Sequence, residues 1–258
     1  DRSRGLGDVY KRQIDSWHYR QRILSFFGRV NYDYKSKYLL SLVLRRDGYS
    51  KLPKDNRWGT FPGISAGWVL SRENFMESCS NVLSYAKIRA SYGANGNVSG
   101  VLDANGNVVT GLDYYTVQGS YGIMKDKDGK IVPNYNGKVP LMINDLPNPT
   151  MRWEKSYTFE TGFDIGFLNN KYILNFTYYN RRTQDKFAEI TLPSHSGVSS
   201  FLSNNGEVQN QGMELELTAN VLRTKDWKFT VSMNTAYNKN KIISVSYTHL
   251  RAHETDQY

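Results

Sequence analysis

Two pairs of carboxylates have a spacing that could support acid–base chemistry, namely Glu160 with Asp164 and Glu214 with Glu216. Paired carboxylates provide the general acid and the base or nucleophile of glycoside hydrolysis. The same spacing arises on an amphipathic β-strand without any catalytic role, because residues two or four positions apart share one face. Each pair lies in a segment of alternating polar and apolar residues, so strand alternation is the favoured interpretation. The chain is therefore not expected to be an enzyme.

Other motifs that could carry chemistry are incomplete. His195 lies in a Pro-Ser-His-Ser-Gly segment and has no partnered nucleophile at a recognisable spacing. Residues 126–129 read Asp-Lys-Asp-Gly but lack the later ligands of an EF-hand, so a tight turn is expected there. Cys79 is the single cysteine, which excludes an internal disulfide and a multi-cysteine metal site. We expect no cofactor and no metal site.

Four tyrosines in the longest expected connection, residues 95–151, are candidates for ligand contact. The connection contains Asn-Gly at 105–106 and Asp-Gly at 128–129, dipeptides that tight hairpin turns favour, so ordered hairpins are expected. Aromatic faces held in such a loop could stack on a sugar ring, although packing within the loop is the commoner role. The candidate residues are Tyr114, Tyr115, Tyr121 and Tyr135.

The elements that must position these residues are β-strands, because alternation with a period of two dominates the chain and helical periodicity is almost absent. From Met213 to Val221, for example, apolar residues alternate with polar ones. Eight strands are expected, each within the usual boundary error. They span approximately residues 24–34, 38–49, 60–71, 83–94, 152–168, 172–191, 207–222 and 227–243.

The lengths of the connections favour a membrane barrel. Short connections are expected at 35–37, 71–82, 169–171 and 223–226, and they alternate with long ones at 50–59, 95–151 and 192–206. This alternation, with strands long enough to cross a bilayer, is typical of bacterial outer-membrane barrels. The expected fold is all-β, an antiparallel up-and-down meander that forms about eight strands of a larger transmembrane barrel. Aromatic residues expected at the membrane interfaces are Trp58, Trp68, Trp153, Tyr178 and Tyr179.

The chain is also basic, with 33 Lys and Arg against 24 Asp and Glu and a net charge of +9. Basic charge with interleaved aromatic residues can indicate single-stranded nucleic-acid binding. The Arg-Arg pairs are residues 45–46 and 181–182, each near the end of an expected strand. Pairing with carboxylates in the lumen or at the rim, or contact with anionic outer-leaflet sugars, explains these pairs at least as well. No nucleic-acid partner is expected.

The two ends of the chain encode opposite strands of one DNA sequence. Back-translation of residues 3–13 gives a sequence whose reverse complement, in a shifted frame, encodes residues 245–255. Such a relationship is expected of the adapter used in transposon-based sequencing libraries. Residues 1–13 and 245–258 are therefore expected to be adapter-derived and are excluded from the fold prediction. The natural segment, residues 14–244, is expected to be a fragment of a longer reading frame.

Five segments, in this order, closely resemble the barrel of the SusC/RagA family of TonB-linked outer-membrane proteins of Bacteroidetes. The segments are residues 38–48, 57–68, 87–97, 152–164 and 204–216. The resemblance extends over nearly all of residues 24–243. It implies that residues 14–244 are a piece of a TonB-dependent receptor barrel of about 22 strands, which normally encloses a plug domain.

The resemblance also implies partners, a location and a transport function. The partners would be a SusD-like surface lipoprotein, outer-membrane lipid, and TonB through a region N-terminal to this segment. The transported substrate would be an oligosaccharide or a peptide, taken up across the outer membrane. The alternative interpretation is a soluble β-sandwich that acts as a carbohydrate-binding module, in which the apolar strand faces would be buried against protein and not exposed to lipid.

Overall fold

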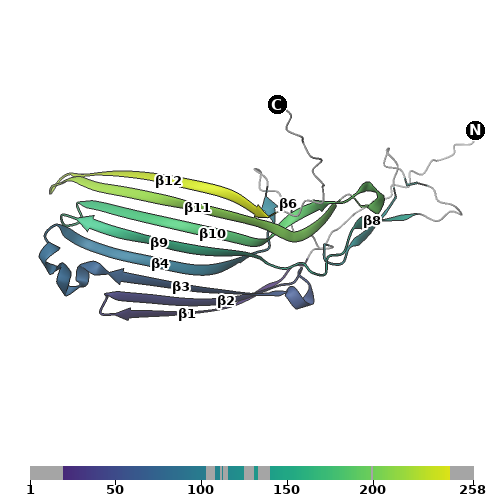
Figure 1. Ribbon diagram of the computed structural model, residues 1–258, viewed down its shortest axis with the longest axis horizontal. Coiled ribbons are helices and arrows are strands. Elements are labelled where there is room, and N and C mark those ends of the chain that lie inside the picture. The colour runs from purple at the N-terminus through teal and green to yellow at the C-terminus, as the bar shows by residue number, and fades with distance from the viewer. Residues whose placement is uncertain are drawn as a thin grey trace, which may run out of the picture.

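The computed structural model describes residues 20–102, 108–110, 112, 116–124, 131–132, 140–198 and 200–244. Its main element is one antiparallel sheet of eight strands, each hydrogen-bonded to the next along the chain (Figure 1). No helix in the described part of the chain has the length and apolar character to cross a membrane. In spatial order the strands are β1 (Ile23–Tyr34), β2 (Tyr38–Tyr49), β3 (Trp58–Val69), β4 (Leu83–Asn97), β9 (Glu154–Phe167), β10 (Tyr172–Thr191), β11 (Ser200–Arg223) and β12 (Lys228–Ser244).

This topology confirms the expected all-β meander of eight strands. The sheet is open, with β1 and β12 at its two edges, as expected for part of a larger barrel. A β-sandwich would require a second sheet packed on the first and Greek-key connections. The two additional sheets among the described residues are two-stranded hairpins in the long connection between β4 and β9.

The expected start of β11 was wrong by seven residues. The strand begins at Ser200 and pairs with the far end of β10 through Ile190 and Phe201, so the connection expected at 192–206 is shorter. The polar sequence at 203–206 resembled a loop. It remains in the strand because β10 also continues beyond a register shift between Thr183 and Lys186.

Tight turns connect the strands at one end of the sheet, which we call the short-turn end. Lys35 and Ser36 both have positive φ, 53° and 51°, and the Asp33 carboxylate accepts a hydrogen bond from the Ser36 N–H at 2.6 Å. Mirror-image turns of this kind match the right-handed twist of the paired strands. The connection from β3 to β4 is longer and contains two 3-10 helices, η2 (Leu70–Arg72) and η3 (Asn74–Cys79).

The opposite end, which we call the long-loop end, carries the short elements of the long connections. They are η1 (Lys54–Asn56), β5 (Val101–Leu102), β6 (Val108–Thr110), β7 (Ser120–Ile123), β8 (Leu141–Asp145) and η5 (Ser194–Ser196). β5 pairs antiparallel with β6, and β7 with β8, which confirms hairpins in this connection. The expected Asn-Gly and Asp-Gly turns themselves lie outside the described residues.

The register of the strands separates an apolar face from a polar face. One cross-strand row contains Ile88, Phe163, Phe176 and Leu215. The next row, on the other face, contains Arg89, Gly162, Thr177 and Glu214. Large apolar side chains are exposed along the first face, whereas most of the buried hydrophobic residues gather at the long-loop end. A soluble protein would bury such a face, but in a bilayer it contacts lipid while the polar face lines the lumen.

Candidate functional site

The sheet divides at the long-loop end, and this division creates the site. The β3–β4 ladder ends at the pair Gly63 and Gly93, next to Pro62, which has no N–H to donate. Beyond that point β3 remains paired with β2 as far as Trp58, and β4 remains paired with β9 as far as Asn97. A wedge opens between the two halves of the sheet.

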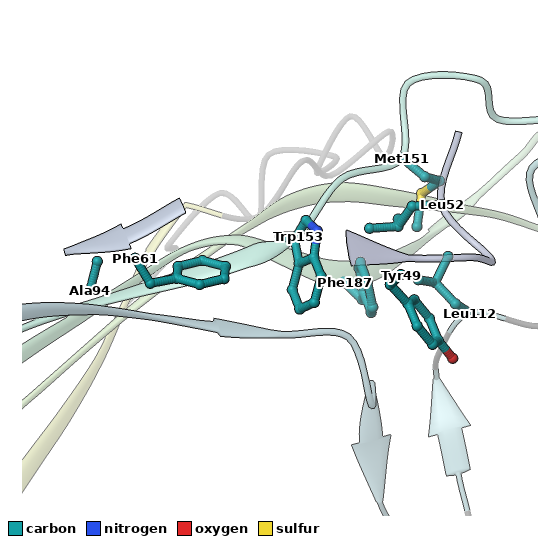
Figure 2. Close-up of a cluster of buried hydrophobic side chains, with 8 residues drawn as sticks. All are labelled: Tyr49, Leu52, Phe61, Ala94, Leu112, Met151, Trp153 and Phe187. Atoms are coloured by element: carbon teal, nitrogen blue, oxygen red, sulfur yellow. The ribbon is translucent and has the colours of Figure 1, made fainter. Parts of the chain in front are cut away.

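Buried hydrophobic side chains fill this wedge (Figure 2). The Trp153 ring contacts Phe61 and Tyr49 edge-on, with ring centroids 5.5 and 6.3 Å apart. Its indole N–H donates to the Arg57 carbonyl oxygen at 3.0 Å, which ties the start of β9 to the start of β3. The buried members of the cluster are Tyr49, Leu52, Phe61, Ala94, Leu112, Met151, Trp153 and Phe187.

A buried carboxylate lies beside this cluster. Glu154 is 2% exposed and accepts hydrogen bonds from the Phe187 N–H at 2.6 Å and the Asn97 side-chain amide at 2.8 Å. A carboxylate is rarely buried unless its oxygens are hydrogen-bonded, and here the two bonds join β4, β9 and β10. Glu154 was not among the residues singled out in the sequence. The available signal for its burial was its position directly after Trp153, at the start of an expected strand.

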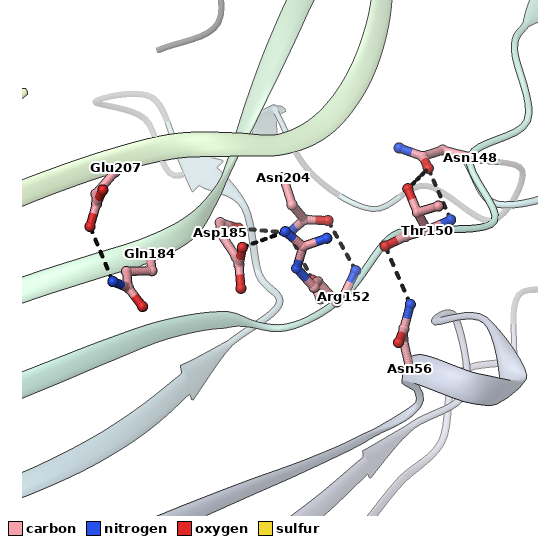
Figure 3. Close-up of polar contacts among 8 residues, drawn as sticks. All are labelled: Asn56, Asn148, Thr150, Arg152, Gln184, Asp185, Asn204 and Glu207. Carbon is pink, nitrogen blue, oxygen red and sulfur yellow. Dashed lines mark hydrogen bonds and ion pairs between the residues drawn. The ribbon is translucent and has the colours of Figure 1, made fainter. Parts of the chain in front are cut away.

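Polar contacts also fix the segment that leads from the long connection into β9 (Figure 3). Arg152 forms an ion pair with Asp185 at 2.6 Å, and Asp185 has a positive φ of 57° at the irregularity in β10. Asn204 accepts a hydrogen bond from the Arg152 N–H at 3.0 Å and donates to the Arg152 carbonyl oxygen at 2.9 Å. Asn148 donates to the Leu202 carbonyl oxygen at 2.8 Å. The end of the long connection is therefore held firmly against β10 and β11.

The four carboxylates considered for catalysis lie on the polar face, as their alternation predicted. An open pocket of about 860 Å³ is lined by Asp164, Glu214 and Glu216 together with Arg89 and uncharged polar groups. Arg89 forms an ion pair with Asp164 at 3.3 Å. Within the described part of the chain, no cluster of His, Cys, Asp and Glu could hold a metal ion. The arrangement is an open, charged surface on the polar face of the sheet.

The remaining motif residues have structural contacts. His195 is exposed on η5, and the neighbouring Ser196 hydroxyl lies 2.7 Å from the Pro193 carbonyl oxygen and 2.9 Å from that of Val198, as a donor in this turn. Arg45 pairs with Asp47 at 2.7 Å, and Arg182 pairs with Glu207. One arginine of each Arg-Arg segment therefore pairs with a carboxylate, which is one of the two explanations that the sequence allowed.

The structure places only one of the four candidate tyrosines. Tyr121 lies on β7 in the β7–β8 hairpin, with 75% of its surface exposed. Tyr114, Tyr115 and Tyr135 lie outside the described residues. The exposed ring of Tyr121 is available for stacking at the long-loop end. Ligand contact by the four tyrosines remains a prediction.

The expected interface aromatics divide into two groups. Trp58, Trp68 and Tyr178 lie on the apolar face, where Trp68 stacks on a neighbouring tyrosine with ring centroids 6.3 Å apart. The prediction was wrong for Trp153, which is 5% exposed in the buried cluster because it fills the wedge. It was also wrong for Tyr179, which pairs with Glu160 on the polar face.

The sequence matches the family described as TonB dependent receptor-like, beta-barrel, over residues 1–256. The chain belongs to the TonB-dependent receptor family. TonB-dependent receptor SusC of Bacteroides thetaiotaomicron is 32% identical over 240 residues, which are 93% of this chain and 22% of that protein. TonB-dependent receptor P3 of Formosa agariphila is 33% identical over 239 residues, again 93% of this chain and 22% of the relative.

The fold is also similar to that of a solved receptor. The RagAB peptide importer in its open-open state gives a TM-score of 0.73 with 26% identity, covering 89% of this chain and 23% of that chain. These similarities confirm the SusC/RagA resemblance and the outer-membrane location, and they do not support a soluble carbohydrate-binding module. TonB-dependent receptors are transporters and not enzymes. The chain spans about a fifth of the length of these relatives.

Proposed function

We propose that this chain is part of the barrel wall of an importer that carries oligosaccharides or peptides across the outer membrane. The single observation that carries the proposal is the eight-strand meander with its polar and apolar faces separated, similar to the wall of the RagAB peptide importer. A polar face with charged side chains such as Arg89 and Asp164 suits a hydrated substrate path. A SusD-like lipoprotein would bind the substrate at the cell surface, and TonB would supply the energy through a region N-terminal to this segment.

The long-loop end faces the cell exterior in this proposal, and the short-turn end faces the periplasm. Outer-membrane barrels have short periplasmic turns and longer external loops. The 35–37 turn and the 95–151 connection fit the two sides of that pattern. The exterior end would be the side on which the substrate and the lipoprotein arrive.

The 95–151 connection is the part of the segment proposed to contact the ligand. Connections longer than about 15 residues are usually functional or disordered, and the β5–β6 and β7–β8 hairpins favour function. The buried cluster around Trp153 and the ion pair of Arg152 with Asp185 give the connection a rigid base. The aromatic residues proposed to stack on the substrate or the lipoprotein are Tyr114, Tyr115, Tyr121 and Tyr135.

No enzymatic step is proposed for this segment. The carboxylates of the polar face are strand-alternation residues, and Asp164 is already paired with Arg89. The expected chemistry is binding and passage of the substrate. A hydrolytic activity of the purified receptor on an imported oligosaccharide or peptide would contradict this assignment.

Replacing residues 100–140 with a short Gly-Ser linker in the full-length receptor tests the role of the connection. We expect the barrel to assemble at its normal level, as followed by heat-modifiable gel mobility, because every buried member of the cluster around Trp153 except Leu112 is retained. Substrate uptake or lipoprotein association should fall. Unchanged assembly with both activities unchanged would show that the connection does not contribute to import.

Single substitutions at Tyr121 provide a sharper comparison, because this ring is exposed and its removal leaves no cavity. Tyr121→Ala removes the stacking face, whereas Tyr121→Phe retains it. Loss of a stacked ring costs about 1 kcal/mol, so uptake at limiting substrate should fall about fivefold for the first variant only. Equal uptake by the two variants would exclude stacking by Tyr121.

We also propose that residues 1–13 and 245–258 are adapter-derived, on the basis of their shared coding sequence. Amplification of the gene from genomic DNA without a transposon adapter would test this. The natural reading frame should diverge from the present sequence near residues 14 and 244. An amplified gene that encodes both ends unchanged would contradict the proposal.

A further inference from the structure

The apolar face ends abruptly on the last three strands, and a polar surface replaces it towards the long-loop end. Tyr178, Met213 and Tyr237 are the last apolar residues of this face before the polar surface on β10, β11 and β12, and on β12 Ile243 follows the polar positions. Met213 is 48% exposed and Tyr237 63% exposed in this sheet. In the bilayer, these exposed side chains would contact lipid. The next outward-facing positions therefore lie just beyond the hydrocarbon, at the level of the lipid headgroups.

Six polar residues occupy these positions, and the strand register brings them together. Asn180 pairs with Gln211 and Gln211 with Lys239 in the first row beyond the apolar face. In the following row, Arg182, Gln209 and Lys241 are in register in the same way. We call this surface the outer basic patch; it consists of Asn180, Arg182, Gln209, Gln211, Lys239 and Lys241.

The outer basic patch has an excess of positive charge. Arg182 forms an ion pair with Glu207, so the charge of one cation of the patch is balanced. Among the described residues, no carboxylate forms a salt bridge with Lys239 or Lys241, and both lysines are exposed. The side-chain amide of Gln209 donates to Asn180 at 2.9 Å, which orients these two amides on the surface.

We propose that the outer basic patch binds the phosphorylated headgroup of an outer-leaflet glycolipid, the lipid A portion of lipopolysaccharide. Phosphate groups would contact the two lysines, and sugar hydroxyls would hydrogen-bond the amides of Gln209 and Gln211. The patch is continuous with the lipid-facing apolar surface, so a ligand with acyl chains below and a charged headgroup above matches both parts. This inference rests on the proposed orientation of the long-loop end, and it is independent of the imported substrate.

A second position on the same face has a similar arrangement. Arg46 on β2 lies over the ring of Trp58, with its guanidinium carbon 5.4 Å from the ring centroid, and Phe26 stacks on the same ring. A cation held beside an interfacial tryptophan is also at headgroup level. Near the short-turn end of β10–β12, the lipid-facing residues Tyr172, Ala219 and Val231 are uncharged, and a nearby cation is Lys171, whose nitrogen lies 5.6 Å from the centroid of the Tyr172 ring.

The test measures lipid A binding by the full-length receptor in detergent, using native mass spectrometry with bisphosphorylated lipid A. The same glycolipid after phosphatase treatment is the comparison ligand. The test variant is Lys239→Gln/Lys241→Gln. The matched control is Lys225→Gln/Lys228→Gln, which removes two lysines at the other end of the same hairpin.

Each lysine near an anionic lipid surface is worth about fivefold in affinity, so the patch variant should bind bisphosphorylated lipid A about thirtyfold more weakly. The control variant should bind it normally, and both should bind the dephosphorylated glycolipid like the parent. Lys239→Arg/Lys241→Arg retains the charge and should retain binding. Equal heat-modifiable mobility of all variants would show that the barrel is intact.

Three results would overturn the proposal. Unchanged affinity of the patch variant would remove the lysines from lipid binding. A loss confined to the control variant would place the short-turn end in the outer leaflet. Weaker association with the surface lipoprotein, with lipid A affinity unchanged, would identify the patch as a protein interface. Substrate uptake measured in parallel separates these results from failure of the import proposal, because uptake should persist in the patch variant.

Discussion

Trp153 should be the residue on which the stability of the long-loop end depends most. It is 5% exposed, it contacts Phe61 and Tyr49, and its N–H donates to the Arg57 carbonyl oxygen across the wedge. Trp153→Phe retains an aromatic ring but leaves that carbonyl oxygen without its donor, which costs about 1–3 kcal/mol of unfolding free energy. Trp153→Ala also empties the wedge, and truncation of a buried tryptophan costs about 3–5 kcal/mol.

The measurement is urea unfolding of the full-length receptor in phospholipid vesicles, combined with limited proteolysis of the 95–151 connection. Trp227 is the matched control, because it is 74% exposed at the short-turn end. Its substitution should change the unfolding free energy by less than about 0.5 kcal/mol. Faster cleavage of the connection is expected only for the Trp153 variants. If Trp153→Ala is no more destabilising than Trp227→Ala, the cluster does not stabilise the long-loop end.

Two further predictions concern the strand faces and the short-turn end. Leu217→Arg places a charge on the lipid face at a cost of about 2–4 kcal/mol near the bilayer midplane, whereas Glu216→Gln changes only the lumen. Barrel assembly, followed by heat-modifiable mobility, should fail for the first and persist for the second, and equal tolerance would contradict the face assignment. The Trp68 indole hydrogen bond and two further donors hold the pKa of Glu73 below its ordinary value of 4.5. Its contribution to stability is therefore present above pH 4.5 and lost as the pH falls further, so Glu73→Gln should reduce the loss of unfolding free energy in acid. Glu77→Gln, in the same segment, is the control, and a similar acid profile for both variants would refute the prediction.

Much of the fold could be predicted from the sequence because strand alternation is a local property. Successive side chains point to opposite faces, so the segment from Met213 to Val221 determines its own apolar face without reference to any partner strand. Alternating connection lengths then indicate neighbours in sequence order. The mistake at Tyr179 was avoidable, because adjacent residues such as Tyr178 and Tyr179 cannot share a face.

The long-loop end was decided by contacts between residues distant in the sequence. Trp153 resembled an interface aromatic, but the end of the β3–β4 ladder at Gly63 and Gly93 opens the wedge that buries it. Asn204 lies in a loop-like sequence, yet it remains in β11 and bonds to Arg152, which is 52 residues away. Side-chain burial and hydrogen bonding of this kind depend on which strands separate and which continue, and alternation within one strand does not contain that information.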